Sequence, residues 1–443
     1  MSEPVLLVAV DGLDWKRLRA GVAAGHLPEM ARLLREGAHA EVAVRACVPG
    51  LTAVEEPLNS PTLWTTVATG QYYFKHGVYD FCNLLDSAEN PPLFESRHVL
   101  TPRLWDVLSH YGRDSIVVGY YVTYPAYPIR GVMVSDLFGE VAARKGVWPP
   151  SLADGLSRVL GAESYESYAT ALRSTLPEDL IRVEHGPVRR VDRHQSAVAD
   201  WHRILERFTC LSADERAALL SSPAEAARQK QVEYRLIYPV LRDERFHRIF
   251  LHLLGSQPWG LAIVYYRLVD FVSHGFWVET PGPPGDFVRA FGTVVEEAYR
   301  WIDERLGELR QSVPPGTRLL VLSDHGFERD GRVSPSQEWR DGPEVSLGRH
   351  ADPAVLIAHG GPARGALRGV SLLDIAPTVY EYFDVPQARS LDGGPVPGLL
   401  RVGEPAGGRT VSGYPYTRPT EAGEMEEPEQ RAVLERLAAL GYM

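Results

Sequence analysis

Val5-Leu6-Leu7-Val8-Ala9-Val10 is an unbroken apolar run that ends in Asp11-Gly12. A run without polar alternation is typical of a strand buried on both faces, as the strands of parallel sheets are. Ligands of open α/β sheets bind at the carboxyl ends of the strands, where Asp11 would project. The simpler alternative is that Asp11 only caps the helix that follows.

The same pattern returns twice further along the chain. Apolar runs at 261–266 and 318–322 also lead directly into polar residues, and segments with helical pattern separate the three runs. This alternation predicts an α/β fold with a mostly parallel sheet flanked by helices. The polar residues that follow the two later runs are Asp270, His274, Asp324 and His325.

A different composition occupies the middle of the chain. Between 138 and 259 the sequence is rich in arginine and glutamate, and helical pattern covers roughly 197–220 and 223–254. We interpret 138–259 as an inserted, mainly helical cap. Residues 1–137 and 260–443 would then form the α/β core.

A candidate nucleophile lies in the stretch from Asn59 to Gly70. Ser60 followed by Pro61 is typical of a helix N-cap, and Gly70 would end that helix after two to three turns. A hydroxyl at a helix N-terminus lies in a positive field that favours an oxyanion. Ser60 could attack an electrophile if a base or a metal activated it, although an ordinary cap is the simpler alternative.

Carboxylates and imidazoles gather at the predicted strand ends. Parallel topology brings these ends to one edge of the sheet. Such ligands without thiolates suit zinc, manganese or iron(II), and the set is too large for one tetrahedral zinc but about right for two. Two metals roughly 4 Å apart can hold both oxygens of an in-line phosphoryl displacement. Taken singly, each residue could instead serve a turn or a hydrogen-bonded pair. The set is Asp11, Asp270, His274, Asp324, His325 and His350, of which His350 is expected to lie in a loop after the third strand.

Composition limits the remaining possibilities. The 443 residues are 44% hydrophobic and 23% charged, and the net charge of −11 argues against a nucleic-acid partner. The three cysteines are scattered, which favours a reducing compartment without disulfides or thiolate zinc sites. No basic leader precedes the first strand, and no apolar run approaches the ~20 residues that span a membrane. We therefore expect a cytoplasmic protein without a membrane partner.

Together these motifs resemble those of a known family. In their order along the chain, the segments 5–12, 60–81, 270–277, 323–327 and 348–383 resemble the alkaline phosphatase superfamily, specifically its type I phosphodiesterase/nucleotide pyrophosphatase branch. The resemblance implies an alkaline-phosphatase-like fold for the core and covers none of the predicted cap.

The resemblance also implies roles for individual residues. One metal would be held by Asp11, Ser60, Asp324 and His325, and the other by Asp270, His274 and His350. Zinc is the favoured metal and manganese the alternative. Counting back from Thr69-Gly70 places the nucleophile at Ser60, with Thr62 as a second candidate, and the reaction would pass through a covalent phospho-enzyme. Asn83 would help to bind the substrate phosphate, and His76 would be structural.

The hypothesis is therefore a metal-dependent phosphoric ester hydrolase. We expect a two-metal phosphodiesterase or nucleotide pyrophosphatase that acts on a small phosphoester, nucleotides among the candidates. Serine at position 60, where diesterases of the family usually carry threonine, keeps a phosphomonoesterase or phosphomutase open. A phosphonate hydrolase, or a catalytically silent binding protein with this fold, would carry the same residues.

Overall fold

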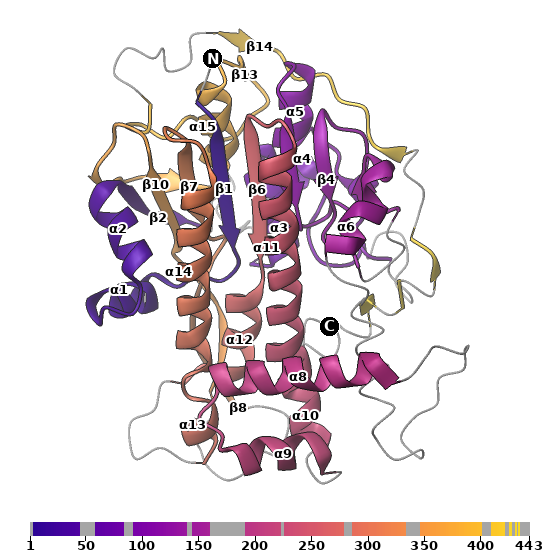
Figure 1. Cartoon of the computed structure of the whole chain (residues 1–443). Helices are drawn as coiled ribbons and strands as arrows, with labels where there is room; N and C mark the ends of the chain where they lie inside the picture. The colour runs from indigo at the N-terminus through magenta and orange to yellow at the C-terminus, as the bar shows by residue number, and fades with distance from the viewer. Residues whose placement is uncertain are drawn as a thin grey trace.

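Ten strands of the described chain form one sheet at the centre of the molecule (Figure 1). The computed structural model describes residues 3–44, 58–83, 92–139, 144–159, 191–222, 226–278, 286–333, 346–400, 409–420, 425–427, 430–431 and 433–434. Strand β1 (Val5–Val10) lies in the middle, parallel to β6 (Leu261–Tyr266) and β7 (Arg318–Leu322). The three apolar runs thus form the three central strands, as predicted.

The sheet continues outward on both sides of these strands. Next to β6 lie β3 (Ser115–Val118) and β4 (Gly131–Val134), both parallel, and then the antiparallel β5 (Val147–Trp148). Next to β7 lies β10 (Ala354–His359), antiparallel, followed by β2 (Ala38–Ala43), β11 (Gly365–Ala366) and β12 (Val370–Ser371). The sheet is therefore mostly parallel, which confirms the predicted fold class.

Helices cover both faces of the sheet. Alternate residues of β1 enter two separate cores, with Leu6, Val8 and Val10 in one and Val5, Leu7 and Ala9 in the other. The first core includes residues of α1 (Trp15–Ala23), α2 (Pro28–Glu36), α11 (Tyr238–Ser256), α12 (Leu268–Phe276), α13 (Asp286–Phe291) and α14 (Val294–Ser312), and it continues into buried residues between 153 and 237. The second is completed by α3 (Ser60–Thr69), α5 (Leu104–His110) and α15 (Ile375–Tyr382).

Smaller elements complete the described part of the chain. They are α4 (Tyr73–His76), α6 (Ala153–Val159), the antiparallel pair β8 (Gly326–Val333) and β9 (Ser346–Ala351), and the short pair β13 (Gln387–Ala388) and β14 (Thr410–Val411). His350 therefore lies in a strand, and its predicted place in a loop is wrong, because β9 pairs with β8 directly after the Asp324-His325 turn. The described helices include none with both the length and the apolar character needed to cross a membrane.

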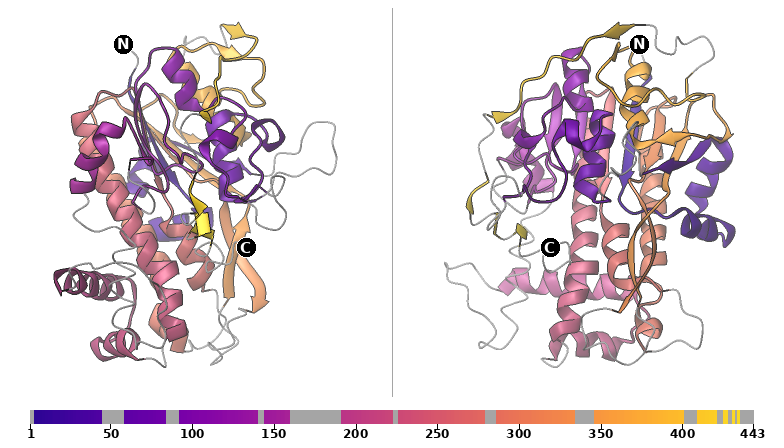
Figure 2. Two further views of the ribbon diagram at one scale, coloured as in Figure 1. Left: turned by 90° about the vertical axis from the view of Figure 1, so that its right-hand side faces the viewer. Right: turned by 180° about the vertical axis from the view of Figure 1, so that it is seen from behind.

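The middle of the chain is helical, but its helices have two different surroundings. Helices α8 (Val191–Phe208), α9 (Ala213–Ser221) and α10 (Ala226–Val232) lie beyond one end of the sheet (Figures 1 and 2). Helix α11 instead packs against β3 and β6, although it belongs to the segment predicted as cap. Residues 160–190 lie outside the described part. The division into core and cap stays a proposal, and we place its second boundary before α11.

The predicted helical segment 197–220 is divided into α8 and α9 in the structure, whereas the segment 223–254 corresponds to one uninterrupted helix in which a π-helical turn, Glu233–Ile237, joins α10 to α11. The break between α8 and α9 has a clear cause. The Ser212 side chain accepts a hydrogen bond from the Glu215 amide, and the Glu215 side chain accepts one from the Ser212 amide. This reciprocal capping box starts a new helix at that point.

Candidate metal centre and nucleophile

Helix α3 presents Ser60 at the carboxyl edge of the sheet. The structure places the N-cap at Asn59, whose side chain accepts a hydrogen bond from the Thr62 amide at 3.0 Å, so the prediction that Ser60 caps the helix is wrong by one residue. Asn59 takes the cap position because the oxygen of its side chain can accept a hydrogen bond from the unpaired backbone amides of the first helical turn. Ser60 is thereby spared that role, and its hydroxyl donates instead to Asp11 Oδ1 at 3.2 Å. Gly70 ends the helix in a left-handed conformation, as predicted.

The first ligand group lies at the ends of β1 and β7. Side-chain atoms of Asp11, Asp324 and His325 all lie within 4.8 Å of one another, and all three side chains are buried. The Nε2 atom of His325 is 3.2 Å from Asp11 Oδ1 and 3.5 Å from Asp324 Oδ2. The strand ends are tied together because the Leu13 amide donates to the Ser323 hydroxyl at 2.8 Å. The sheet itself therefore fixes this group.

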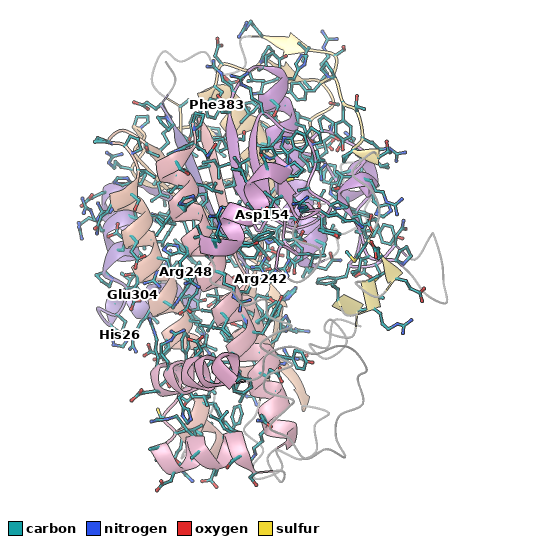
Figure 3. The ribbon with its side chains drawn as sticks, turned by 45° about the vertical axis from the view of Figure 1, so that its right-hand side comes forward. His26, Asp154, Arg242, Arg248, Glu304 and Phe383 are labelled. Atoms are coloured by element: carbon teal, nitrogen blue, oxygen red, sulfur yellow. The ribbon has the colours of Figure 1, made fainter. Side chains whose placement is uncertain are left out.

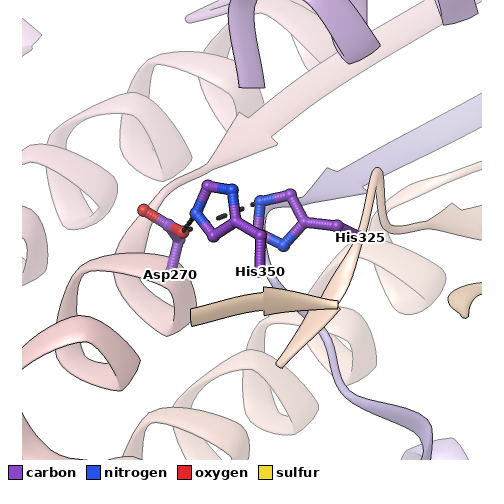
Figure 4. A group of neighbouring side chains, drawn as sticks. All are labelled: Asp270, His325 and His350. Carbon is purple, nitrogen blue, oxygen red and sulfur yellow. Dashed lines mark ion pairs between the residues drawn. The ribbon is translucent and has the colours of Figure 1, made fainter. Parts of the chain in front are cut away.

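The second group lies beside the first, on α12 and β9. Asp270, His325 and His350 are the side chains shown in Figure 4, and their ligand atoms also lie within 4.8 Å of one another. Asp270 Oδ1 is 3.2 Å from His350 Nε2 and 3.3 Å from His274 Nε2. Asp270 and His274 share one face of α12, as their spacing predicts. His325 lies within reach of both groups, so the two groups adjoin.

Two glycines allow these elements to approach so closely. A Cβ atom on Gly12 would lie 2.5 Å from Phe327 Cε2 and 3.0 Å from the Cα atom of Asp270. A Cβ atom on Gly348 would lie 2.6 Å from the carbonyl oxygen of Ser273. Neither position has room for a larger residue. The end of β1 and the strand β9 can therefore both reach α12.

The hydrogen bonds of the three histidines are those of metal ligands. The Nδ1 atoms of His274, His325 and His350 lie 3.1, 3.0 and 2.7 Å from the backbone carbonyl oxygens of Gly348, Gly326 and Leu58. A carbonyl only accepts, so each Nδ1 carries the proton and each Nε2 presents a lone pair. The Nε2 atoms of His274 and His350 are only 2.8 Å apart. Two lone pairs that face each other at that distance repel, and a cation between or beside them would stabilise the arrangement.

The charges of the site also favour cations. Burial, together with the carboxylates of Asp11 and Asp270, raises the pKa of Asp324 well above its ordinary value. Burial lowers the pKa of His274, which favours the neutral imidazole that binds metals. Asp324 Oδ2 and His325 Nε2 are buried and make no hydrogen bond to any described residue. Metal ions would satisfy these orphaned atoms, so the residues present fit a two-metal centre.

Comparison with known proteins identifies the family. A family model described as type I phosphodiesterase/nucleotide pyrophosphatase matches residues 5–343. The chain belongs to that family. The resemblance found in the sequence is thereby confirmed, and membership of the type I phosphodiesterase/nucleotide pyrophosphatase family makes phosphoester hydrolysis the class of chemistry to be tested.

Individual relatives of this family member are distant. The alkaline phosphatase PafA matches with a TM-score of 0.50 at 13% identity, over 90% of this chain and 100% of PafA, which supports the fold. Murine ectonucleotide pyrophosphatase/phosphodiesterase 5 matches with a TM-score of 0.41 at 12% identity, over 86% of this chain and 95% of that protein. The phosphoglycerate mutase (2,3-bisphosphoglycerate-independent) of Cereibacter sphaeroides is 30% identical over 144 residues, 32% of this chain. The chain spans only 25% of that curated relative's length.

The remaining residues predicted for the site of this phosphodiesterase-family chain have different surroundings in the structure. The Asn83 side chain accepts a hydrogen bond from the Tyr79 hydroxyl at 2.9 Å, and its role toward phosphate stays a prediction. The Thr62 hydroxyl is buried and makes no hydrogen bond to a described residue, whereas Ser60 contacts Asp11. This contrast favours Ser60 over Thr62. His76 lies 3.0 Å from the Thr66 hydroxyl and supports α3 from its far side, in keeping with a structural role.

Sequence reasoning missed two residues beside the centre. The Tyr265 hydroxyl donates to Asp11 Oδ2 from β6, and burial raises the pKa of Tyr265 well above the ordinary value, so it stays a donor. Arg267 follows the same strand and is buried. The sequence could have pointed to both residues, because they place polar atoms at the end of an apolar strand. They were overlooked because the aromatic rings of Tyr265 and Tyr266 also suit a buried strand.

Proposed function

We propose that this protein hydrolyses a phosphodiester or phosphoanhydride bond of a small substrate, with two divalent metal ions and Ser60 as the nucleophile. One observation carries the proposal. A buried serine hydroxyl at a helix N-terminus adjoins two groups of carboxylates and of imidazoles whose Nε2 lone pairs converge. Family membership supports the same reaction class.

We assign the ligands as the family resemblance implies. Asp11, Asp324 and His325, with the Ser60 hydroxyl, would hold one ion. Asp270, His274 and His350 would hold the other, which is supported by the short distances from Asp270 to both histidines. Imidazole and carboxylate ligands favour zinc, with manganese as the alternative. Bound there, the ions would supply positive charge that lowers the pKa of the Ser60 hydroxyl and offsets the charge of the phosphoryl oxygens.

The protein's own groups define the two steps. Ser60 Oγ, held by Asp11 at the start of α3, forms a bond to phosphorus while the bond to the leaving oxygen breaks, and the hydroxyl proton is transferred through solvent to that leaving oxygen. The N-terminal amides of α3 favour the anionic phosphoryl group. A water molecule then attacks phosphorus from the vacated side, the bond to Ser60 Oγ breaks, and Ser60 regains its proton. Tyr265 keeps the Asp11 carboxylate oriented throughout.

A phosphomonoesterase or phosphomutase is the second candidate. The specific observations that favour it are the serine at position 60 and the match to a phosphoglycerate mutase over 144 residues. A phosphonate hydrolase would use the same residues. The helices α8–α10 would contribute to substrate choice, and three scattered cysteines keep the cytoplasm as the proposed compartment.

The test is the ratio of two hydrolysis rates. We would measure kcat/KM of the metal-loaded protein for bis(nitrophenyl) phosphate and for nitrophenyl phosphate. The proposal predicts the higher kcat/KM for the diester, and Ser60→Ala should remove both activities. A strong monoester preference would replace the first candidate by the second. If the metal-loaded protein turned over no phosphoester, the alternative of a catalytically silent binding protein with this fold would be favoured.

A further inference from the structure

A pocket adjoins the N-terminus of α3. It holds about 620 Å³ of non-atom space, part of it open to solvent. Its walls include the residues next in sequence to Ser60 and Asp270, so it lies directly beside the proposed centre. Those walls include Pro61, Phe94, Tyr121, Asp136, Arg267 and Phe271. Most of this lining is aromatic or apolar, and Arg267 brings a positive charge into it.

Arg267 has hydrogen-bonding capacity that the described chain does not use. The residue is only 6% exposed, and its Nε and Nη2 atoms are buried without a hydrogen bond to any described residue. The Asp136 carboxylate is 3.6 Å from Nη2, which is too long for a good hydrogen bond. The guanidinium carbon lies 4.1 Å from the centre of the Tyr121 ring. Stacking therefore holds the group in place while leaving donors unmatched.

The surroundings of Arg267 are rigid. Asp243 Oδ2 accepts hydrogen bonds from the Arg267 and Leu268 amides, both at 2.8 Å, and so fixes the start of α12. Asp243 is paired in turn with Arg242 at 2.9 Å (Figure 3 labels Arg242 on α11). Arg242 also donates to the Gly119 carbonyl at 3.1 Å. The arginine of the pocket is thus positioned by a buried network before any ligand arrives.

We propose that Arg267 forms an anion subsite, which binds a carboxylate or second phosphate on the group attached to the transferred phosphoryl. The inference rests on the proposed function. A planar guanidinium with two donors that make no hydrogen bond to a described residue matches the two oxygens of such an anion, and a buried site strengthens this contact. The aromatic walls would hold the connecting carbon atoms. The subsite therefore selects substrates with two anionic groups over substrates with one.

Continuity between the pocket and the centre supports this arrangement. The Tyr121 ring lies 5.2 Å from the Tyr265 ring, and Tyr265 donates to Asp11. Arg267 lies over the same Tyr265 ring at 5.6 Å. A ligand that reached from Ser60 along these rings would meet the guanidinium.

The experiment compares ligands that are not hydrolysed and differ in one group. We would measure the dissociation constants of propylphosphonate, carboxyethylphosphonate and propylene bisphosphonate for the metal-loaded protein by calorimetry. We expect at least one doubly anionic ligand to bind about tenfold more tightly than propylphosphonate, because charge-assisted hydrogen bonds form only with it. The tighter binder of these two doubly anionic ligands shows whether the subsite prefers a carboxylate or a second phosphate. Equal affinities for all three would overturn the proposal.

Variants assign the preference to Arg267. Arg267→Met should reduce the affinity ratio to about one, and Arg267→Lys should keep part of it because the charge remains. Asp136→Asn should raise the ratio, since the carboxylate 3.6 Å away competes for the guanidinium. Arg318→Met is the matched control, because Arg318 is equally buried at the opposite end of β7 and is paired with Glu3 and the Leu399 carbonyl. A ratio unchanged in Arg267→Met would contradict the proposal.

The outcomes separate this inference from the proposed function. Tighter binding of a doubly anionic ligand without turnover of any phosphoester would contradict the proposed function alone. Turnover of a phosphoester together with equal affinities for all three ligands would contradict the anion subsite alone. Failure of every phosphonate to bind would contradict both.

Discussion

The metal-type centre and the Arg267 pocket adjoin each other at the N-terminus of α3, yet they are built in different ways. The centre takes its carboxylates and imidazoles from strand ends and from α12, where main-chain pairing fixes their positions. The pocket takes aromatic side chains from connecting segments, at Phe94 and Tyr121, and from helices α11 and α12, at Tyr238 and Phe271. The two proposals therefore assign the chemistry to polar groups at the strand ends and on α12, and the selectivity to the aromatic side chains and Arg267 beside them.

Because of this contrast, we expect mutations in the two regions to have different effects on activity. Damage to the centre should stop turnover of every substrate, because all substrates share the phosphoryl group. Damage to the pocket should change the ranking of substrates, because only some carry the second group. The following predictions test this separation, from the largest expected effect to the smallest.

Ser60→Ala should have the largest effect on turnover. Loss of the nucleophile removes the covalent route, so we expect kcat/KM to fall by about a thousandfold or more for all substrates. Thr62→Val is the matched control, since the Thr62 hydroxyl makes no hydrogen bond to a described residue, and its kcat/KM should stay within about threefold. Steady-state assays would show this. The reverse order of the two losses would make Thr62 the nucleophile.

Tyr265→Phe should have an intermediate effect, at the border of the two regions. The change removes the hydroxyl that donates to Asp11 but keeps the ring that faces Tyr121 and Arg267. Partners of metal ligands are typically worth about 10–100-fold in metal affinity or activity, and we expect a loss of that size. The ratio between doubly and singly anionic ligands should not change. A changed ratio would show that the two regions are not separate.

His76 should affect stability and not chemistry. Burial lowers its pKa to about 3, so the folded protein keeps it neutral while the unfolded chain takes up a proton below about pH 6.5. The unfolded state then binds more protons as the pH falls, and stability decreases. From about pH 8 to about pH 5 the native protein should lose about 2 kcal/mol more unfolding free energy than His76→Gln. Denaturant titrations would measure this, and parallel losses in both proteins would disprove it.

The gathering of these carboxylates and imidazoles could be predicted from the sequence because their positions obey a local rule. Asp11, Asp270 and Asp324 each follow an apolar strand, and parallel topology alone brings such positions together. The predicted cap at Ser60 was wrong by one residue because Asn59 competes for the same amides. His350 was placed in a loop because the sequence of β9, Ser346–Ala351, contains no apolar run, although it pairs with the preceding strand β8.

The pocket could not be predicted in the same way. Its residues come from separate segments, and phenylalanine or tyrosine at these positions equally suits an ordinary core. Arg267 has two buried donors without a hydrogen bond to a described residue, whereas the buried Arg103 and Arg242 each have one, and no sequence pattern records this difference. The central strands were predicted because each is an unbroken apolar run. The break within the predicted helical segment 197–220 was missed, because a capping box starts a new helix there.

The metal content of the purified protein tests the central claim most directly. Elemental analysis of the native protein and of Asp324→Ala should find about two zinc or manganese ions per chain in the first. The variant should hold fewer, because Asp324 belongs to the group at the ends of β1 and β7. Native protein without metal, even after incubation with zinc and manganese, would contradict the account and leave the cluster a structural one.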